Sequence, residues 1–342
     1  MKILVTGGAG FIASNFVRYM LSRYPDVSIV NLDSLTYAGN LENLADLDER
    51  RHVFIKGDIS SVEDVESVFK KHSFENVVNF AAESHVDRSL HFGAQVFIRT
   101  NIAGTQVLLD MSRQYGVKRF VQISTDEVYG SLGNTGKFTE MSTIQPNNPY
   151  AATKASADFM VRAAHKSHGL NAVITRCSNN FGPYQFPEKL IPLMIANALE
   201  NRDLPVYGDG MHVRDWIFVI DHCSAIDLVM RNAEAGSIYN IGSDHDVPNL
   251  EIVKLVLKIL DKPETLIKHV LDRPGHDRRY AMDSSKIRKD LGWRPAFSFE
   301  QAMKKTVDWY LGNRAWLEHI RSGAYMKYYE TLYRDRLAKS SS

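Results

Sequence analysis

Tyr150 and Lys154 lie four residues apart, directly after Pro149. Side chains at this spacing share one face of a helix, and proline is favourable at the start of a helix. A tyrosine phenol has an ordinary pKa of ~10, so it works as a base near pH 7 only when a nearby cation favours the phenolate. The pair therefore predicts a phenol base assisted by the Lys154 ammonium. The alternative is a structural amphipathic helix, because this spacing is common by chance.

Three polar residues, Thr125, Asp126 and Glu127, follow a run with apolar residues at positions 120, 121 and 123. If that run is a strand of a doubly wound sheet, the three side chains lie at its carboxyl end, where such sheets bind ligands. Neighbouring carboxyl groups in different surroundings can act as acid and base. The segment predicts acid–base chemistry, with a polar loop that caps a helix as the alternative.

A glycine-rich turn, Gly7-Gly8-Ala9-Gly10, follows the first apolar run of the chain and precedes a predicted helix. Gly7 permits a tight turn, and Gly10 lets the backbone approach a pyrophosphate at the helix N-terminus. Ala13 occupies the place of a usual third glycine and is still small enough for helix–strand packing. The turn predicts dinucleotide binding, although a tight turn alone explains it too.

Asp33 lies 23 residues beyond Gly10, at the end of the second predicted strand. This is close to the ~20-residue spacing at which a carboxylate accepts hydrogen bonds from an adenosine ribose. Because Ser34, Leu35 and Thr36 follow without an Arg or Lys, the segment favours NAD over NADP. A capping or turn aspartate is the alternative. Asp58 is expected near the adenine or in a solvated turn.

Apolar β-branched runs alternate with amphipathic stretches along the first half of the chain. Buried strands joined by helices predict an α/β fold with a doubly wound parallel sheet. The predicted strands span 3–6, 28–33, 53–57, 77–82, 120–124 and 172–176. The predicted helices span 11–24, 61–71, 94–115, 150–168, 189–200, 222–233, 249–261 and 299–311.

Length and composition limit the classes of function. The 342 residues suggest two domains at about 100–200 residues each. A formal charge of +1 gives no field that attracts nucleic acid or anionic membranes. The two cysteines, Cys177 and Cys223, indicate neither a disulfide framework nor a metal site. With no signal sequence at Met1 and no apolar run of ~18 residues, the chain is expected to be cytoplasmic.

These features together resemble the extended short-chain dehydrogenase/reductase family, and more closely its dTDP-glucose 4,6-dehydratase members. The resemblance covers nearly the whole chain. It rests on the glycine turn, the Tyr150/Lys154 pair and the longer segments 35–40, 81–89, 177–180, 186–192 and 273–280. Ala13, Phe181 and the segment 242–248 depart from the pattern, and the last leaves the nucleotide base and the sugar less certain than the reaction.

The resemblance implies a mechanism. Tyr150 takes the proton of the glucose 4-hydroxyl as hydride passes to NAD, with Thr125 bonded to the same oxygen. The 4-keto group then acidifies the C5 hydrogen, which Glu127 removes while Asp126 protonates the departing 6-hydroxyl. Hydride finally returns to C6 and C5 is reprotonated, so the product is a dTDP-4-keto-6-deoxyglucose and NAD is regenerated. Lys154 supports the phenol and holds the nicotinamide ribose.

The resemblance also implies the binding residues. NAD is expected to contact Gly7, Gly10, Phe11, Ile12, Asp33, Ser34, Leu35, Thr36, Asp58, Ile59, Phe80, Ala81, Ala82, Ser84, Thr100, Tyr150, Lys154 and Asn180. The nucleotide-diphosphate hexose is expected to contact Ser84, Thr125, Asn179, Lys189, Leu190, Pro205, Val206, Tyr207, Arg214, Asn249, Arg273 and His276. Without the resemblance, the residues of the second set also fit ordinary structural roles: the arginines could be solvated, His276 could be structural, and Tyr207 could belong to the core.

The expected organisation is a Rossmann-like NAD-binding domain over 1–180, with later sheet-associated segments near 222–241. A mainly nucleotide-sugar-binding lobe follows over 181–330, then a tail over 331–342. The helices near 94–115 and 150–168 are expected to form a homodimer interface, although their stripes also fit packing within one chain. Three alternatives remain: a UDP-hexose dehydratase, a nucleotide-sugar 4-epimerase without need of the acid, and an inactive NAD-binding protein.

Overall fold

The chain forms a seven-stranded parallel sheet in this computed structural model, which describes residues 1–91, 93–272 and 276–322. The strand order is β10-β6-β5-β4-β1-β2-β3, and every neighbouring pair is parallel. The strands are β1 (Lys2–Thr6), β2 (Ser28–Asp33), β3 (His52–Lys56), β4 (Asn76–Asn79), β5 (Arg119–Thr125), β6 (Ala172–Cys177) and β10 (Ile238–Ile241).

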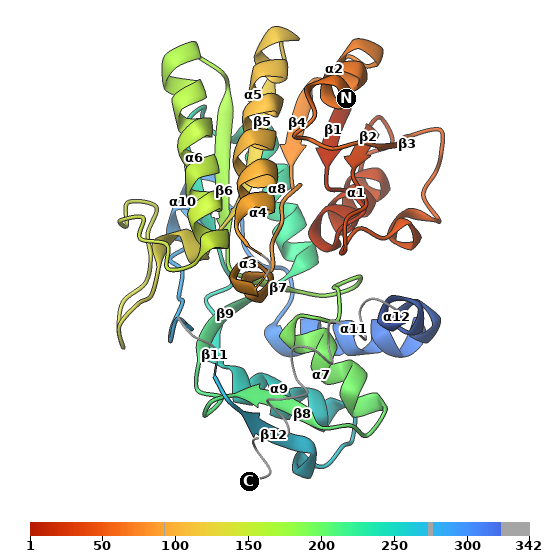
Figure 1. Ribbon diagram of the computed structural model, residues 1–342, viewed down its shortest axis with the longest axis vertical. Coiled ribbons are helices and arrows are strands. Elements are labelled where there is room, and N and C mark those ends of the chain that lie inside the picture. Colours follow the sequence, from red (N-terminus) through yellow and green to blue (C-terminus); the bar gives the residue numbers. More distant parts are fainter. Residues whose placement is uncertain (92, 273–275, 323–342) are drawn as a thin grey trace.

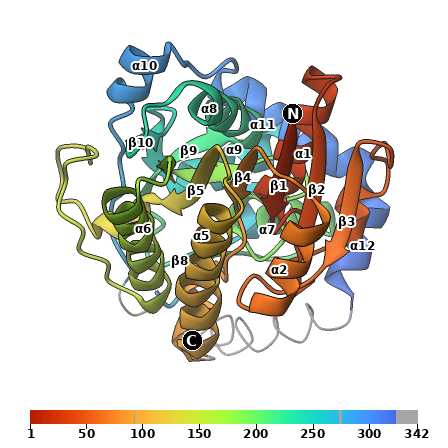
Figure 2. The same cartoon turned by 90° about the horizontal axis from the view of Figure 1, so that it is seen from above.

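Helices cover both faces of this sheet (Figure 2). One face packs against α1 (Phe11–Arg23), α8 (Val219–Asn232) and α10 (Ser285–Leu291), and the other against α2 (Val62–Lys71), α5 (Thr105–Gln114) and α6 (Pro149–His168). Successive residues of β1 point to opposite faces of the sheet. Ile3 and Val5 pack in the apolar cluster on the α1 and α8 face, and Leu4 packs in the cluster on the α2 and α5 face. This explains why the strands are apolar without alternation.

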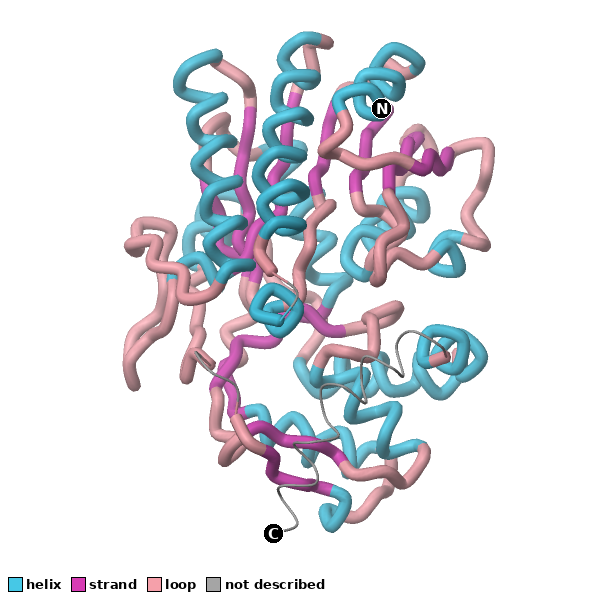
Figure 3. Tube along the Cα trace, in the orientation of Figure 1, coloured by secondary structure: helices cyan, strands magenta, loops and turns pink. Residues whose placement is uncertain are grey.

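A second lobe lies beyond the carboxyl ends of the strands (Figures 1 and 3). Its apolar cluster is built mainly from α7 (Leu190–Leu199), α9 (Asn249–Ile259), α11 (Phe299–Gly312) and α12 (Arg314–Arg321). Two small sheets complete it: β12 (Ile267–Val270) with β8 (Leu204–Tyr207), and β11 (Asp246–Pro248) with β9 (Val213–Phe218) and β7 (Asn179–Phe181). Ligands of doubly wound folds bind at this end of the sheet.

The structure confirms the predicted fold class and all six predicted strands, with one shortened strand. β4 ends at Asn79, so residues 80–82 are loop rather than strand. The predicted helix over 94–115 is interrupted: α4 (Gln95–Phe97) leads into a π-helical segment over 98–104 before α5. Helices α10, α12 and the short α3 (Val86–His91) were not predicted. The predicted tail over 331–342 lies outside the described residues.

Among the residues that the structure describes, no helix is both long and apolar enough to span a membrane.

Candidate active site

A cavity of about 510 Å³ lies between the carboxyl ends of the main strands and the second lobe. Its walls include the glycine turn, the end of β5, the start of α6 and the segments around positions 189, 207, 214 and 276. The predicted residues on its walls are Gly7, Gly10, Phe11, Ile12, Asp33, Ser34, Thr36, Asp58, Ile59, Phe80, Ala81, Ala82, Ser84, Thr100, Thr125, Asp126, Glu127, Tyr150, Lys154, Asn179, Asn180, Lys189, Leu190, Pro205, Tyr207, Arg214, Asn249 and His276.

Two predicted residues, Leu35 and Val206, do not line this cavity. Leu35 adopts a left-handed backbone (φ 55°) at the turn after β2. Val206 is 1% exposed and packs in the core of the second lobe. It lies between Pro205 and Tyr207 on β8, and alternate residues of a strand point to opposite faces. Arg273 lies outside the described residues.

The glycine turn has the geometry that a close backbone approach requires. Gly7 has φ +69°, and a Cβ added there would lie 2.7 Å from the Cα of Ala81. Gly10 precedes α1, whose first turn contains no acidic residue and receives no side-chain cap from Gly10. The first N–H groups of α1 and the positive end of its dipole are therefore available to an anion. These observations fit the pyrophosphate of a dinucleotide.

Gly7→Ala is expected to weaken NAD binding at least tenfold, because the added Cβ meets the Ala81 backbone and the positive φ disfavours a side chain. The affinity for NAD is measured by fluorescence titration. Gly169→Ala is the matched control: Gly169 has φ +67°, but a Cβ there meets open space. Equal losses of NAD affinity in both variants would contradict a specific role for the close approach at Gly7.

Asp33 connects the glycine turn to the end of β2. Its carboxylate accepts hydrogen bonds from the Ala9 N–H (2.9 Å) and the Leu35 N–H (2.7 Å). Burial raises the pKa of this carboxyl above its ordinary value. The turn-aspartate alternative therefore describes part of its role. Because the Asp33 side chain also lines the cavity, it remains in a position to accept from a ribose hydroxyl.

The chemically active groups meet at the end of β5. The Thr125 hydroxyl caps the short helical turn over 126–129, accepting from the Glu127 N–H (3.3 Å). The same hydroxyl donates to the Asp126 carboxyl (3.2 Å), and Thr125 and Tyr150 both line the cavity. The Asn148 side chain caps α6 through the Ala151 N–H (2.8 Å) and donates to the Glu127 carboxylate (3.3 Å). These contacts connect both acids to the start of α6, which contains Tyr150.

The surroundings of Asp126 favour its protonated form. Burial, followed by the neighbouring Glu127 charge, raises the pKa of this carboxyl to about 8. Its Oδ2 atom is buried and has no hydrogen-bond partner among the described residues. A carboxyl that keeps its proton at neutral pH is suited to act as a general acid.

Tyr150 and Lys154 have different immediate surroundings in the structure. Burial, and next the charge of Glu127, raises the pKa of Tyr150 well above 10. The Lys154 ammonium instead donates to the Ile123 carbonyl at 2.7 Å. Burial lowers the pKa of Lys154, and the nearby Asp158 opposes that change. The sequence spacing correctly predicts the shared helix face but not this competing carbonyl acceptor.

Comparisons with known proteins identify the family. A family model described as GDP-mannose 4,6 dehydratase matches residues 4–306. A dTDP-glucose 4,6-dehydratase of Xanthomonas campestris pv. campestris (strain B100) is 51% identical over 341 residues, which cover 94% of this chain and 96% of the relative. The chain belongs to the nucleotide-sugar 4,6-dehydratase family.

Two further comparisons extend over nearly the whole chain. The crystal structure of a dTDP-glucose 4,6-dehydratase from Streptomyces venezuelae with NAD bound superposes with a TM-score of 0.90 at 49% identity, covering 94% of this chain and all of that one. The low-salt glycan biosynthesis protein Agl12 of Haloferax volcanii is 52% identical over 314 residues, covering 92% of this chain and 99% of the relative. The predicted family resemblance is confirmed.

Sequence reasoning missed several cavity residues of this family member. Arg99, from the π-helical segment, lies on the wall and contacts the Asp58 carboxylate at 3.1 Å. Glu188 is buried on the wall, where burial raises its carboxyl pKa to about 7, and it accepts from the Tyr37 hydroxyl at 3.2 Å. The segments 35–40 and 186–192, already part of the resemblance, contained the signal for Tyr37 and Glu188.

A buried network behind the cluster was also missed. The Arg176 guanidinium on β6 contacts the Asp158 carboxylate of α6 at 2.9 Å and donates to the Tyr129 hydroxyl at 2.9 Å. That hydroxyl donates to Asn240 on β10 at 2.7 Å. The network therefore fixes α6, which contains Tyr150 and Lys154, against the sheet.

Proposed function

We propose that this protein converts dTDP-glucose to dTDP-4-keto-6-deoxyglucose, as an NAD-dependent hydro-lyase. The observation that supports this most directly is the buried Asp126 carboxyl beside Glu127, hydrogen-bonded to Thr125 on the wall of the cavity that Tyr150 also lines. Burial and the Glu127 charge raise the pKa of Asp126, which favours its protonated form. An oxidation or epimerisation at C4 needs the phenol but no acid that expels a hydroxyl. The protonated acid therefore favours a dehydratase over a 4-epimerase.

NAD, when bound, supplies the hydride acceptor and donor for this redox-neutral reaction. Gly7, Gly10 and the first turn of α1 would hold its pyrophosphate, and Asp33 would accept from the adenosine ribose. A 2′-phosphate at that place would face the Asp33 carboxylate, so we infer NAD rather than NADP. Lys154 and Asn180, on the cavity wall, lie in the part that would receive the nicotinamide half.

The proton transfers follow from the cluster. Tyr150 acts in its phenolate form, which a neighbouring cation such as the Lys154 ammonium favours, and accepts the proton of the sugar 4-hydroxyl. The Thr125 hydroxyl would bond to the same oxygen. Once C4 is a ketone, the C5 hydrogen is acidic, and Glu127 accepts it as a proton. Asp126 donates its proton to the 6-hydroxyl as the C6–O bond breaks and the C5–C6 double bond forms, so one water leaves. General acid and base catalysis contribute ~10²–10⁴-fold each.

The opposite wall suits a nucleoside diphosphate. Arg214, Lys189 and His276 line it and provide N–H donors for phosphate oxygens. Tyr207 lines the same part and offers an aromatic face to a base. Relatives at 47–51% identity are named dTDP-glucose 4,6-dehydratases, which favours dTDP-glucose over UDP-linked hexoses.

To test the proposed function, the purified protein is incubated separately with dTDP-glucose, UDP-glucose and UDP-N-acetylglucosamine. The molecular masses of the products are measured by mass spectrometry. We expect the loss of one water from dTDP-glucose. Unchanged mass with altered stereochemistry would indicate an epimerase, and loss of water from a UDP-sugar alone would correct the donor. NAD binding without any product would indicate an inactive binding protein.

We also propose that residues 1–180 form the NAD-binding domain and residues 181–330 mainly the nucleotide-sugar lobe. A cytoplasmic location fits the two cysteines, which are free and buried. No nucleic acid or membrane partner is proposed.

We propose a homodimer through α5 and α6, because Phe159 on α6 is 54% exposed and large exposed apolar side chains often mark interfaces. Phe159→Asp is expected to shift the protein from dimer to monomer, measured by light scattering after size-exclusion chromatography. Met141→Asp, at a 92% exposed residue outside these helices, is expected to leave the dimer unchanged. A Phe159→Asp protein that stays dimeric at low micromolar concentration would contradict this interface.

A further inference from the structure

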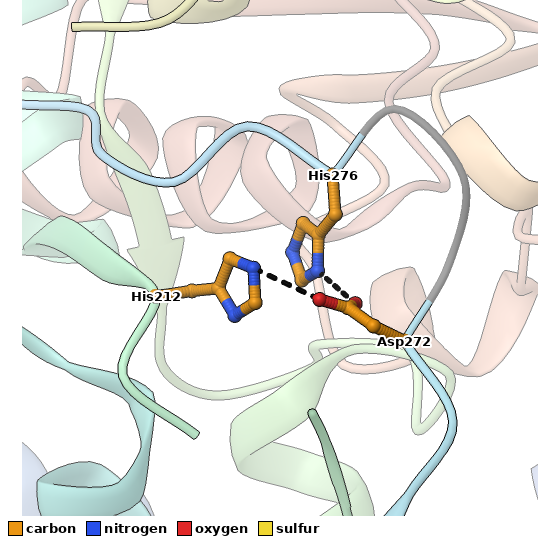
Figure 4. Close-up of side chains that lie close together, drawn as sticks. All are labelled: His212, Asp272 and His276. Carbon is orange, nitrogen blue, oxygen red and sulfur yellow. Dashed lines mark hydrogen bonds and ion pairs between the residues drawn. The ribbon is translucent and has the colours of Figure 1, made fainter. Parts of the chain in front are cut away.

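His212 lies just before β9 and contacts two residues of a different segment, Asp272 and His276 (Figure 4). Its imidazole stacks on that of His276, with ring centroids 3.7 Å apart and planes 14° from parallel. Its Nε2 lies 3.2 Å from one Asp272 oxygen, while His276 Nδ1 lies 2.6 Å from the other. His212 is 3% exposed and is not part of the cavity wall, whereas His276 is.

The start of β9 holds the His276 segment by several other contacts. The Arg214 guanidinium donates to the Asp277 carbonyl at 2.8 Å. The Val213 N–H donates to the Arg278 carbonyl, and its carbonyl accepts from the Tyr280 N–H. The His212 carbonyl also accepts from the Asn249 N–H at 2.9 Å. His212 thus joins segments that provide His276, Arg214 and Asn249 to the nucleotide end of the cavity.

The same three side chains could suggest a metal site, because their ligand atoms lie within 4.8 Å of one another. The ring stacking argues against it. A ligating nitrogen points its lone pair within the plane of its ring, at ~2.0–2.1 Å from the metal. Two nearly parallel rings 3.7 Å apart cannot both point at one ion unless one of them rotates. The arrangement is better explained as packing that fixes His276.

We propose that His212 is a positioning residue for the nucleoside diphosphate: it fixes the ring of His276 and the carboxylate of Asp272, and so sets substrate affinity. This inference rests on the proposed function. The proposed catalytic residues lie on other elements: β5, the turn that follows it, and α6 provide Thr125, Asp126, Glu127 and Tyr150. His212 contacts Asp272, His276 and Asn249 instead. Loss of His212 therefore weakens substrate binding and leaves the chemical step intact.

Two variants separate the contribution of the ring stack with His276 from that of the contact with Asp272. His212→Ala removes both the ring stack and the contact with Asp272, and His212→Gln retains a polar group that can reach Asp272. For His212→Ala we expect the KM for dTDP-glucose and the Kd for dTDP to rise about tenfold, with kcat within about twofold of the parent. For His212→Gln we expect a rise of about threefold. The Kd is measured by calorimetry with NAD-loaded protein, and the melting temperature is recorded for each variant.

His319→Ala is the control, since His319 also contacts a carboxylate, that of Glu42 at 2.8 Å, but is 75% exposed on α12. It is expected to change neither constant. Unchanged KM and Kd in both His212 variants, or a fall in kcat alone, would overturn the proposal. So would a parent Kd that EDTA raises and zinc restores, because that would indicate a metal. A parent that neither binds dTDP nor converts dTDP-glucose would refute the proposed function, and this inference with it.

Discussion

Asp126→Asn is expected to lower kcat for keto-sugar formation by ~10²–10⁴-fold while bound NAD is retained. The amide has nearly the same shape as the acid, but it cannot protonate the departing 6-hydroxyl. The protein keeps its glycine turn and Asp33, on separate elements, so NAD affinity is preserved. The measurement is kcat with dTDP-glucose, together with the NAD content of the purified variant.

The control for this substitution is Asp110→Asn on α5, where the side chain is half exposed and lies outside the catalytic cluster. It is expected to retain full activity. If Asp126→Asn kept more than a tenth of the parent kcat, the acid role would be wrong. If NAD were lost together with activity, the substitution would have damaged binding rather than catalysis.

The raised pKa of Asp126 also gives the sign of two pH effects. The acid is needed in its protonated form, so kcat is expected to fall as the pH rises through about 8. The folded state holds this proton more tightly than the unfolded chain, where the ordinary pKa is 3.8. The contribution to stability is therefore full below about pH 4 and is lost as the pH rises to about 8. Asp126→Asn should raise the melting temperature relative to the parent increasingly across that range.

The sheet was predictable because its signal is local. Six of the seven strands of the main sheet were predicted from short apolar runs, and burial on both faces makes most of those runs visible without knowledge of their neighbours. β10 (Ile238–Ile241) was not predicted as a strand. In the second lobe the helices α7, α9 and α11 were predicted, but the small sheets were not, since β7, β9 and β11 come from segments separated by long stretches of chain. Short strands of three to six residues with mixed burial give no comparable periodicity.

The site was predictable to the extent that it follows strand ends and short spacings. Thr125, Asp126 and Glu127 follow β5 directly, and the i, i+4 spacing of Tyr150 and Lys154 fixes their shared face. Contacts between distant segments were not visible in the same way. The carbonyl of Ile123 that binds Lys154, and the ring of His276 against His212, depend on tertiary packing.

Arg176→Met is expected to lower the free energy of unfolding by about 3–5 kcal/mol. Arg176 and Asp158 are 4% and 2% exposed at their side chains, so removal of the cation leaves a buried carboxylate without its partner. Burial already raises the pKa of Asp158, and Arg176 is the main opposing influence. Chemical denaturation measures the loss.

The double variant Arg176→Met/Asp158→Leu tests the physical cause of that loss. Removing both charges ends the desolvation penalty, so the double variant is expected to recover much of the stability. Lys304→Met is the control, because Lys304 pairs with Asp308 while 67% exposed, and such pairs contribute under about 1 kcal/mol. If the double variant were no more stable than Arg176→Met, the cost would come from lost packing or from the Tyr129 hydrogen bond rather than from the unpaired charge.

Activity should recover along with stability only if the Asp158→Leu change leaves Lys154 bonded to the Ile123 carbonyl, since Asp158 is the acidic group that supports the Lys154 charge.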